Sequence, residues 1–340
     1  MTKLTIFITG QTGYIGGTVV DHLLKNPETK DKFVYRSLVR SADNAKTIQA
    51  LGITPVLGSL DDSKLLSDEA AKADVILHFA DADHLPAIHA FAKGLLQQGH
   101  RHLARPVLIY NSGTGVLLDG AKGAFASKDI YSDDDPDRIL ALPDSANHRN
   151  VELAVLDPKL NEHVDTYIVS PPTIWGTGTG PVHRHSIQIP LLVGNAVKHR
   201  KVYRIGKGLN RWSKIHVADL ANLYVLLTLK SVHQPNDLPK GRKGYYFVEN
   251  GEYAFEDVST ITADELHKQG IAQDAKVYDT PHDKEGEYWI PIAVIYLGGN
   301  SRSRSVIGGK YLGWKATHDL DGKEFEQYIR DEVKRAAHKA

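Results

Sequence analysis

The chain has 340 residues, 41% of them apolar, and its 41 lysines and arginines are balanced by 41 aspartates and glutamates. This length and apolar content can bury a large core, while the zero net charge argues against a protein that binds the phosphate backbone of nucleic acids. The sequence contains no cysteine, which excludes disulfides, thiolate zinc sites, iron–sulfur clusters and cysteine nucleophiles.

The start of the chain and its apolar runs do not fit a secreted or membrane-spanning protein. Glycine and polar residues follow the first basic residue before an apolar core of signal-peptide length can form. The longest mainly apolar runs, residues 187–193 and 292–297, fall far short of the ~20 residues needed to cross a bilayer. We therefore expect a soluble, cytoplasmic protein without a membrane or nucleic-acid partner.

Short apolar runs alternate with helical stretches through the first half of the chain, as in a parallel sheet with crossover helices. Six strands are expected, at residues 4–9, 33–39, 54–57, 75–79, 107–110 and 166–169. Helices are expected between them, several beginning at an aspartate that can cap the first turn, at residues 16–24, 43–51, 61–70, 85–98 and 144–156. This order predicts an α/β fold, a doubly wound parallel sheet of Rossmann type.

The pattern changes after Gly176, where glycine and proline become frequent. Further helices are expected at residues 187–198, 255–269 and 323–337, strands at 202–205 and 245–248, and a strand end running into a helix at 215–229. We therefore expect a sheet domain of residues 1–177, to which residues 210–235 return, and a smaller C-terminal substrate lobe of residues 178–209 and 236–340.

A glycine-rich turn connects the first expected strand to the first expected helix. Its sequence is TGQTGYIG, residues 9–16. Gly10 permits the tight turn, Gly13 lets a pyrophosphate approach the backbone, and Gly16 allows the helix to pack closely on the strand. The first amides of the helix then face the anion. Together the strand, turn and helix predict a dinucleotide-binding site.

The end of the second strand indicates which dinucleotide is bound. Enzymes that select NAD usually place an aspartate or glutamate here, which accepts a hydrogen bond from the ribose 2′-hydroxyl. This chain has Arg40 followed by Ser41, with Arg36 on the same strand, and these side chains could instead bind a 2′-phosphate. The sequence therefore favours NADP(H), with NAD(H) as the alternative.

Four further motifs accompany the glycine turn, namely LHFA at residues 77–80, SPPTIWG at 170–176, HVAD at 216–219 and LGW at 312–314. Together these motifs resemble the extended, or atypical, short-chain dehydrogenase/reductase superfamily, in its NAD-dependent epimerase/dehydratase-like and NmrA-like branch. With the charge at the second strand, the resemblance implies cofactor contacts at Thr9, Gly10, Thr12, Gly13, Tyr14, Ile15, Gly16, Arg40, Ser41, Leu60, Phe79, Ala80, Pro171 and Ile174.

The acid–base centre of that superfamily consists of a serine or threonine after the fifth strand and a Tyr-x-x-x-Lys pair on the next helix. The lysine lowers the pKa of the phenol, so that the tyrosine protonates a carbonyl while hydride arrives. Ser112 matches the first member. A tyrosine stands four residues before a lysine only at Tyr203/Lys207 and Tyr311/Lys315, outside the expected helix. We therefore expect this chain to lack the usual dyad.

The helix that should carry the dyad instead contains His148 and Glu152, four residues apart and therefore on one helical face. His148 could donate a proton near neutral pH, with Glu152 orienting it or favouring its charged form. Ser112 or Thr114 could polarise the substrate. These four residues form the predicted catalytic set, and the alternative is a surface helix with its own ion pair.

Other polar groups carry weaker signals. Tyr131 precedes the acidic run at residues 133–137, which we expect to be a solvated loop because a metal site there would need ligands from elsewhere. His183 and His185 could ligate zinc, but a His-x-His pair alone predicts a metal poorly. His216 is expected to be structural. We therefore predict no metal site.

These inferences favour an NADP(H)-dependent oxidoreductase that reduces a carbonyl or imine of a small molecule with a non-standard proton donor. Two alternatives remain open: a catalytically inactive NADP-binding sensor or regulatory protein, and non-redox use of the same pocket for dehydration, isomerisation or cyclisation. The resemblance also implies a homodimer through the helices that flank the fourth and fifth strands, although the second helix departs from the family pattern.

Overall fold

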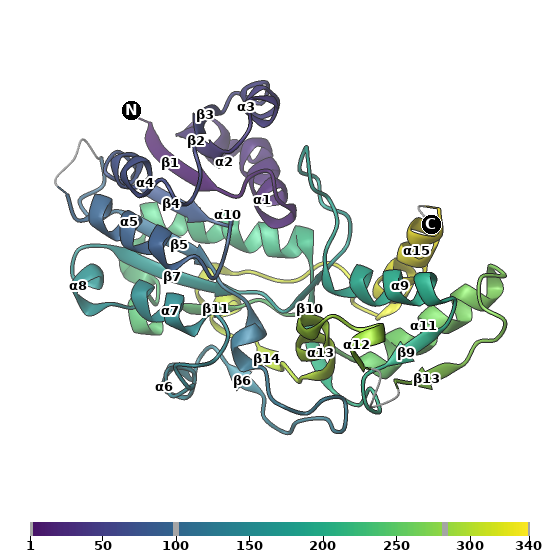
Figure 1. The fold of residues 1–340 in the computed structure, drawn as a ribbon. Helices are drawn as coiled ribbons and strands as arrows, with labels where there is room; N and C mark the ends of the chain where they lie inside the picture. The colour runs from purple at the N-terminus through teal and green to yellow at the C-terminus, as the bar shows by residue number, and fades with distance from the viewer. Residues whose placement is uncertain (1–2, 98–101, 281–284, 339–340) are drawn as a thin grey trace.

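A seven-stranded parallel sheet forms the centre of the molecule in the computed structural model, which describes residues 3–97, 102–280 and 285–338 (Figure 1). The strand order is β11-β7-β5-β4-β1-β2-β3. The strands are β1 (Leu4–Thr9), β2 (Phe33–Val39), β3 (Thr54–Leu57), β4 (Val75–His78), β5 (Val107–Asn111), β7 (Asp165–Ser170) and β11 (Tyr245–Phe247). The order reverses between β1 and β4, the kind of switch point at which doubly wound sheets bind ligands. The predicted fold class is confirmed.

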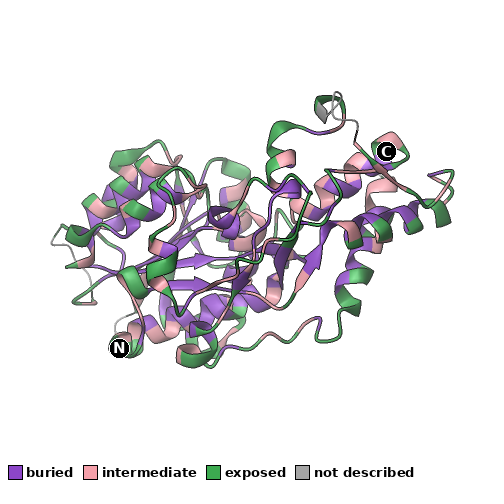
Figure 2. Ribbon diagram, turned by 90° about the horizontal axis from the view of Figure 1, so that it is seen from below, coloured by how far each residue is buried: buried purple, intermediate pink, exposed green. Residues whose placement is uncertain are grey.

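Helices cover both faces of this sheet, and each face has its own apolar core. The core on one face includes α1 (Tyr14–Lys25), α3 (Ala42–Gln49), α10 (Val217–His233) and α14 (Ile307–Leu312). The core on the other face includes α4 (Ser63–Ala70), α5 (Leu85–Leu95) and α7 (Arg149–Val155). In β1, Ile6 and Ile8 join the first core and Phe7 the second, because successive side chains point to opposite faces. Figure 2 shows the buried strands lying between helices with exposed outer faces.

A smaller lobe with a third apolar core lies beside the carboxyl ends of the strands. Its sheets are β12-β10-β8 and the pairs β13-β9 and β14-β6. Its strands are β6 (Tyr131–Ser132), β8 (Thr173–Trp175), β9 (Val202–Arg204), β10 (Arg211–His216), β12 (Glu252–Ala254), β13 (Val277–Asp279) and β14 (Ser303–Arg304). Its helices are α9 (Gln188–His199), α11 (Phe255–Lys268), α12 (Glu285–Tyr288), α13 (Pro291–Gly298) and α15 (Lys323–Ala337). Short connecting helices are α2 (Pro27–Lys30), η1 (Thr114–Leu117), α6 (Pro136–Leu140), α8 (Pro158–Asn161), η2 (Pro235–Asp237) and η3 (Gly241–Lys243).

The six strands predicted in the first half all form, with shifts of one residue at most at each end. The helix predicted at residues 144–156 is much shorter, because α7 begins only at Arg149 and His148 before it is left-handed, with φ +65°. The helix predicted at residues 85–98 ends at Leu95, and Gln98 lies outside the described residues.

The prediction that residues 236–340 all belong to the smaller lobe is wrong. The strand β11 pairs with β7 as the edge strand of the large sheet, and α14 and Trp314 pack on the core that α1 and α10 share. All three residues of β11 are buried aromatic residues, which is typical of a strand covered on both faces. The chain therefore returns to the sheet domain twice after leaving it.

The acidic run is also only partly a solvated loop. Asp133 is buried, and its carboxylate accepts hydrogen bonds from the backbone N–H groups of Phe247, Val306 and Ile307. Asp135 caps α6 by accepting a hydrogen bond from the Arg138 N–H. The run therefore joins β11 to the start of α14, rather than only facing solvent.

Two observations bear on partners. None of the helices in the described ranges is long and apolar enough to cross a membrane. The helices that would flank β4 and β5 in a homodimer are α5 and α7, and α7 is only seven residues long. The homodimer stays a prediction.

Candidate functional site

The glycine turn at the carboxyl end of β1 has one face closed by packing and one face open. Gly10 has φ +79°, and a β-carbon there would lie 2.6 Å from the Ala80 nitrogen. A β-carbon on Gly16 would lie 2.4 Å from the Gly10 carbonyl oxygen. A β-carbon on Gly13 would approach only that same oxygen, at 3.1 Å. The turn thus packs tightly against Ala80 at Gly10 and against itself at Gly16. Its backbone at Gly13, beside the first amides of α1, remains approachable by a diphosphate.

The hydroxyl of Thr9 makes a hydrogen bond within the protein core. It lies 2.6 Å from Nδ1 of His78, whose Nε2 lies 3.2 Å from the Asp81 carbonyl oxygen. Because a carbonyl can only accept, Nε2 carries the hydrogen and Nδ1 accepts from Thr9. Burial lowers the pKa of His78 to about 4, so the ring stays neutral. The Thr9 hydroxyl therefore ties β1 to β4, and the cofactor contact at Thr9 that the resemblance implies stays a prediction.

The end of β2 presents one unpaired arginine. Arg40 is exposed, and it makes no hydrogen bond or ion pair with any other residue that the structure describes. Ser41 caps α3 by accepting a hydrogen bond from the Asn44 N–H at 3.3 Å. Arg36 donates from its Nε to Glu69 at 2.7 Å, and its part in binding a 2′-phosphate stays a prediction. Arg40 is the group at this strand end that can still receive an anion.

A loop from the smaller lobe, residues 176–184, packs against the glycine turn, and we refer to it as the covering loop. Tyr14 donates its hydroxyl hydrogen to the Gly176 carbonyl at 2.8 Å, and the His183 N–H donates to the Thr12 carbonyl at 3.2 Å. A β-carbon on Gly180 would lie 2.7 Å from the α-carbon of Gly17. Figure 1 shows the segment before α9 reaching α1. Thr12 and Tyr14, predicted to contact the cofactor, therefore also hold this loop.

The turn after β5 lies beside the segment after β7. The Ser112 N–H donates to the Val169 carbonyl at 2.8 Å, and the Thr114 N–H donates to the Pro171 carbonyl at 3.0 Å. Pro171 is buried, Ile174 is half-buried, and Leu60, Phe79 and Ala80 follow β3 and β4 at the same carboxyl edge. The residues predicted to surround the nicotinamide and the adenosine are thus arranged along one edge of the sheet.

The carboxylate of Glu152 lies beside this turn and makes no hydrogen bond with the His148 ring, although the Glu152 backbone N–H donates to the His148 carbonyl at 3.0 Å. It is fully buried, and it accepts hydrogen bonds from the Ser112 hydroxyl at 2.6 Å and from the Tyr245 hydroxyl. Arg149 pairs with its other oxygen at 3.4 Å. Burial raises the pKa of Glu152. The predicted side-chain pairing of His148 with Glu152 is wrong, because His148 precedes the helix in a left-handed conformation and its ring pairs with Asp83 instead.

His148 is held by a carboxylate that the sequence prediction missed. Its Nδ1 donates to Asp83 at 2.7 Å, which lowers the pKa of Asp83. Its Nε2 would lie 3.0 Å from a β-carbon on Gly115 and 3.4 Å from one on Gly113. The side chain of His148 is 11% exposed, whereas that of Asp83 is 62% exposed. The ring therefore points Nε2 at the turn after β5. Asp83 follows β4, a neighbour of β5, which is the signal that could have identified it.

Thr114 is not available to a substrate. It is fully buried, and its hydroxyl lies 2.8 Å from the Ser301 hydroxyl, which also donates to the Thr114 carbonyl at 2.7 Å. The prediction that Thr114 could polarise a substrate is therefore wrong. Its contacts instead fasten the C-terminal part of the chain to the turn after β5.

The remaining polar candidates lie elsewhere. Tyr203 packs against Tyr278 and Tyr288 in the smaller lobe. Tyr131 stacks against the Arg138 guanidinium. Among the residues described by the structure, no group of three or more histidines and acidic residues is arranged to hold a metal.

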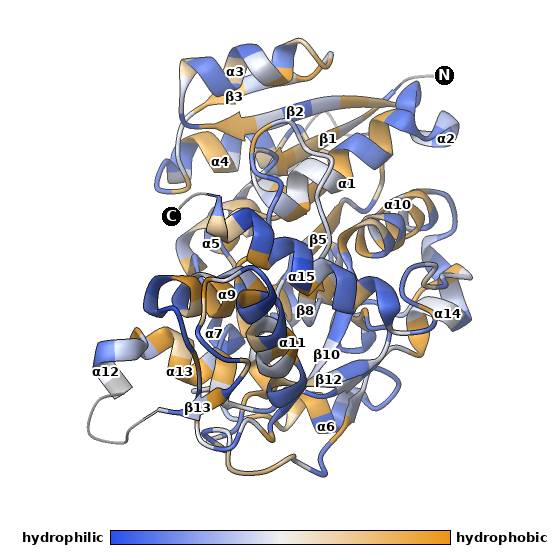
Figure 3. Ribbon diagram, turned by 90° about the vertical axis from the view of Figure 1, so that its right-hand side faces the viewer, coloured by the Kyte–Doolittle hydropathy of each residue, from blue (hydrophilic) through white to orange (hydrophobic). Residues whose placement is uncertain are grey.

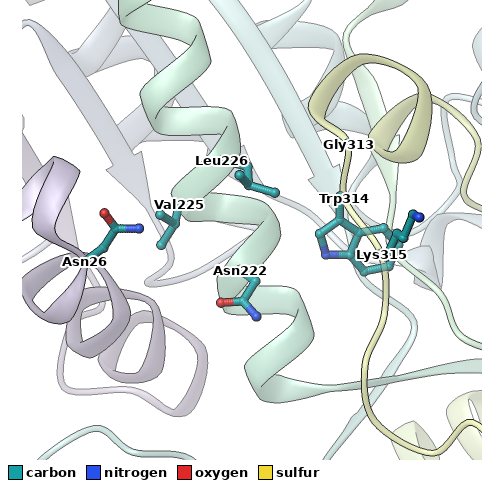
Figure 4. A pocket seen from close by; sticks show the side chains of 7 residues that line it. All are labelled: Asn26, Asn222, Val225, Leu226, Gly313, Trp314 and Lys315. Carbon is teal, nitrogen blue, oxygen red and sulfur yellow. The ribbon is translucent and has the colours of Figure 1, made fainter.

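A cavity of about 290 Å³ lies away from this site (Figure 4). It is lined by Asn26, Asn222, Val225, Leu226, Gly313, Trp314 and Lys315. Asn26 caps the far end of α1, one helix length of about 18 Å from the glycine turn. Lys315 of the Tyr311/Lys315 pair thus lines this cavity and does not lie at the turn after β5.

Known proteins resemble the chain in sequence and in fold. The profile of the NmrA-like family matches residues 2–99. The oxidase ucsJ of Acremonium sp. is 31% identical over 353 aligned residues, which span 98% of this chain and 99% of that protein. The chain belongs to the extended short-chain dehydrogenase/reductase superfamily, in its NmrA-like branch. The chain is thus an enzyme of the extended short-chain dehydrogenase/reductase type.

Two further proteins are similar over different extents. The 4-hydroxy-2-methyl-3-oxo-4-farnesyl-3,4-dihydroquinoline-1-oxide ketoreductase of Stigmatella aurantiaca is 36% identical over 74 residues, 22% of this chain and 21% of that protein. The crystal structure of dTDP-glucose 4,6-dehydratase from Bacillus anthracis in complex with NAD has a TM-score of 0.64 at 17% identity, covering 97% of this chain and 96% of that one. The latter has the same fold.

Proposed function

We propose that the protein is an NADP(H)-dependent oxidoreductase that reduces a carbonyl or imine group of a small molecule, with His148 as the proton donor. The observation that carries this proposal is that Nε2 of His148 faces the turn after β5, at the edge where the glycine turn also lies. Redox relatives named oxidase and ketoreductase, and a fold neighbour that binds NAD, support the reaction type and a nicotinamide cofactor.

The residues at the carboxyl edge fit a dinucleotide. The backbone at Gly13 and the first amides of α1 would hold the diphosphate, and Arg40 would pair with a 2′-phosphate. Phe79 and Ala80 would line the adenosine side, and Pro171 and Ile174 the nicotinamide side. When bound, the nicotinamide supplies a hydride to the carbon of the substrate's carbonyl or imine group.

His148 then supplies the proton. Because Asp83 accepts the hydrogen bond from Nδ1, a proton on Nε2 points into the space above Gly113 and Gly115. The carboxylate of Asp83 stabilises the imidazolium and fixes the ring. Transfer of the Nε2 proton to the substrate oxygen or nitrogen that gains the electron pair completes the reduction and leaves a neutral imidazole.

Ser112 supports the substrate through its neighbour Glu152. With Glu152 ionised, the serine hydroxyl donates to it and can only accept from a ligand. Burial raises the pKa of Glu152, and a protonated Glu152 would donate to Ser112, which frees the serine proton to bind the substrate.

The first test is NADPH consumption with a panel of aldehydes, ketones, quinones and cyclic imines. We expect His148→Ala to lower the rate by about 10²–10⁴-fold, since it removes the proton donor, while NADPH binding followed by fluorescence stays unchanged. His163→Ala, a change at an exposed histidine, is the matched control. Turnover that survives His148→Ala would sink the assignment.

The same experiment separates the other two functions. NADPH binding without turnover of any substrate would favour a sensor or regulatory protein. Substrate conversion without net NADPH consumption would favour dehydration, isomerisation or cyclisation in the same pocket.

A further inference from the structure

A tyrosine from the smaller lobe borders the same space as His148. A β-carbon on Gly115 would lie 3.0 Å from Nε2 of His148 and 3.3 Å from the hydroxyl oxygen of Tyr296. Two polar atoms from different lobes therefore flank one point above the turn after β5. Gly115 leaves this point open, since any larger side chain would meet both rings.

The position of Tyr296 is fixed by contacts at the end of α13, an apolar helix (Figure 3). The Gly298 carbonyl accepts a hydrogen bond from the Gly123 N–H at 2.7 Å, and the Asn300 N–H donates to Asp119 at 2.9 Å. Ser301 is bonded to Thr114 at the turn itself. Because these bonds join the segment after α13 to the segment after β5, the phenol is held relative to the catalytic turn and does not depend on a flexible linker.

The phenol of Tyr296 is free to donate. Its ring packs 6.1 Å from that of Trp212, and within the described ranges its hydroxyl has no hydrogen-bond partner. Burial and the nearby Asp83 raise the pKa of Tyr296, so the hydroxyl keeps its proton at neutral pH. It therefore acts as a hydrogen-bond donor and not as a charged base.

We infer that Tyr296 is the second hydrogen-bond donor to the substrate, opposite His148, and that the site is built for a carbonyl and not for an imine. This inference rests on the proposed function. A carbonyl oxygen has two lone pairs and accepts from both donors, whereas an imine nitrogen has one and cannot. As the carbon accepts hydride and the C=O π bond breaks, the electron pair moves to oxygen, which takes the Nε2 proton of His148. The Tyr296 hydroxyl stabilises the developing negative charge without losing its own proton.

The test compares Tyr296→Phe with Tyr203→Phe, which removes a hydroxyl from a packed ring of the smaller lobe. Loss of one oxyanion donor predicts a fall in kcat of about 10²-fold for aldehydes and ketones in Tyr296→Phe, with unchanged NADPH affinity and thermal midpoint. Tyr203→Phe should stay at the wild-type rate. The wild type should reduce aldehydes and ketones but not cyclic imines.

The possible negative results distinguish the role of Tyr296 from the proposed function. Wild-type turnover that Tyr296→Phe leaves intact, or faster reduction of imines than of ketones, overturns this inference alone. Absence of NADPH oxidation by the wild type overturns the proposed function and the role of Tyr296 with it. A readout independent of turnover is NMR of ¹⁵N-labelled histidine, in which Tyr296→Phe, but not Tyr203→Phe, should shift the His148 Nε2 signal. Identical spectra would show that the two groups do not share this space.

Discussion

His148 combines a strained backbone with a directed side chain. Its φ of +65° places a residue other than glycine in the left-handed region, at a cost of roughly 1–2 kcal/mol. Such strain persists where surrounding contacts impose it, and here the hydrogen bond to Asp83 is one of them. The ring hydrogen-bonds Asp83 and not Glu152, which helical spacing predicts as its partner. One backbone angle thus decides which carboxylate serves the imidazole.

The proposed preference for NADP(H) depends on Arg40. We expect Arg40→Glu to weaken NADPH binding by about 10- to 100-fold, because it removes charge-assisted hydrogen bonds to the 2′-phosphate and adds a like charge. NADH binding should change little. Fluorescence titration with both nucleotides measures this, and Lys32→Glu provides the same charge change at the other end of β2. Equal losses for the two nucleotides would refute the assignment.

Most of the large sheet could be predicted from the sequence, but the position of its edge strand β11 could not. The strands β1, β4 and β5 follow from apolar runs bounded by polar residues, since strands buried on both faces have such sequences. The short β11 reaches the sheet from a late position in the chain, and no local pattern shows which sheet it joins. Tyr296 escaped prediction for the same reason, because its nearness to Gly115 depends on how two distant segments pack.

The covering loop packs its backbone directly against that of α1 at Gly180. Gly180→Ala should loosen this loop, because the new β-carbon would meet the backbone of Gly17 and neither side can yield by a side-chain rotation. We expect faster release of NADPH in stopped-flow displacement, since the loop also holds Thr12 and Tyr14 of the glycine turn. Gly120→Ala, where a β-carbon meets nothing within 4 Å, is the control. Equal release rates in the two variants would argue that the loop does not restrain the nucleotide.

For the whole molecule, the two lobes are joined by polar contacts among buried segments as well as by apolar packing. Asn300 donates to Asp119, Ser301 is bonded to Thr114, and Asp133 binds backbone groups of both β11 and α14. A site assembled from both lobes, with His148 on one and Tyr296 on the other, requires this kind of fixed connection. Changes at these joints should therefore alter activity without touching the site itself.

Asp133 makes this connection sensitive to pH. Burial raises its pKa to about 7, and this outweighs the three backbone N–H groups that favour its charged form. The folded protein thus keeps a proton on Asp133 that the unfolded chain loses near pH 4. The stability contributed by this proton is complete below about pH 4 and is lost as pH rises through about 7, by up to about 4 kcal/mol.

The variant Asp133→Asn should remove this pH dependence. Near pH 4 we expect it to be less stable than the wild type by about 1 kcal/mol, because the amide nitrogen replaces an oxygen that accepts a hydrogen bond from Phe247. The deficit should shrink or reverse by pH 8, where the wild type must bury a charge. Urea unfolding followed by tryptophan fluorescence from pH 4 to 8 measures it, with the exposed Asp137→Asn as control. Parallel curves for the wild type and Asp133→Asn would show that Asp133 is ionised throughout, held by the backbone donors of β11 and α14.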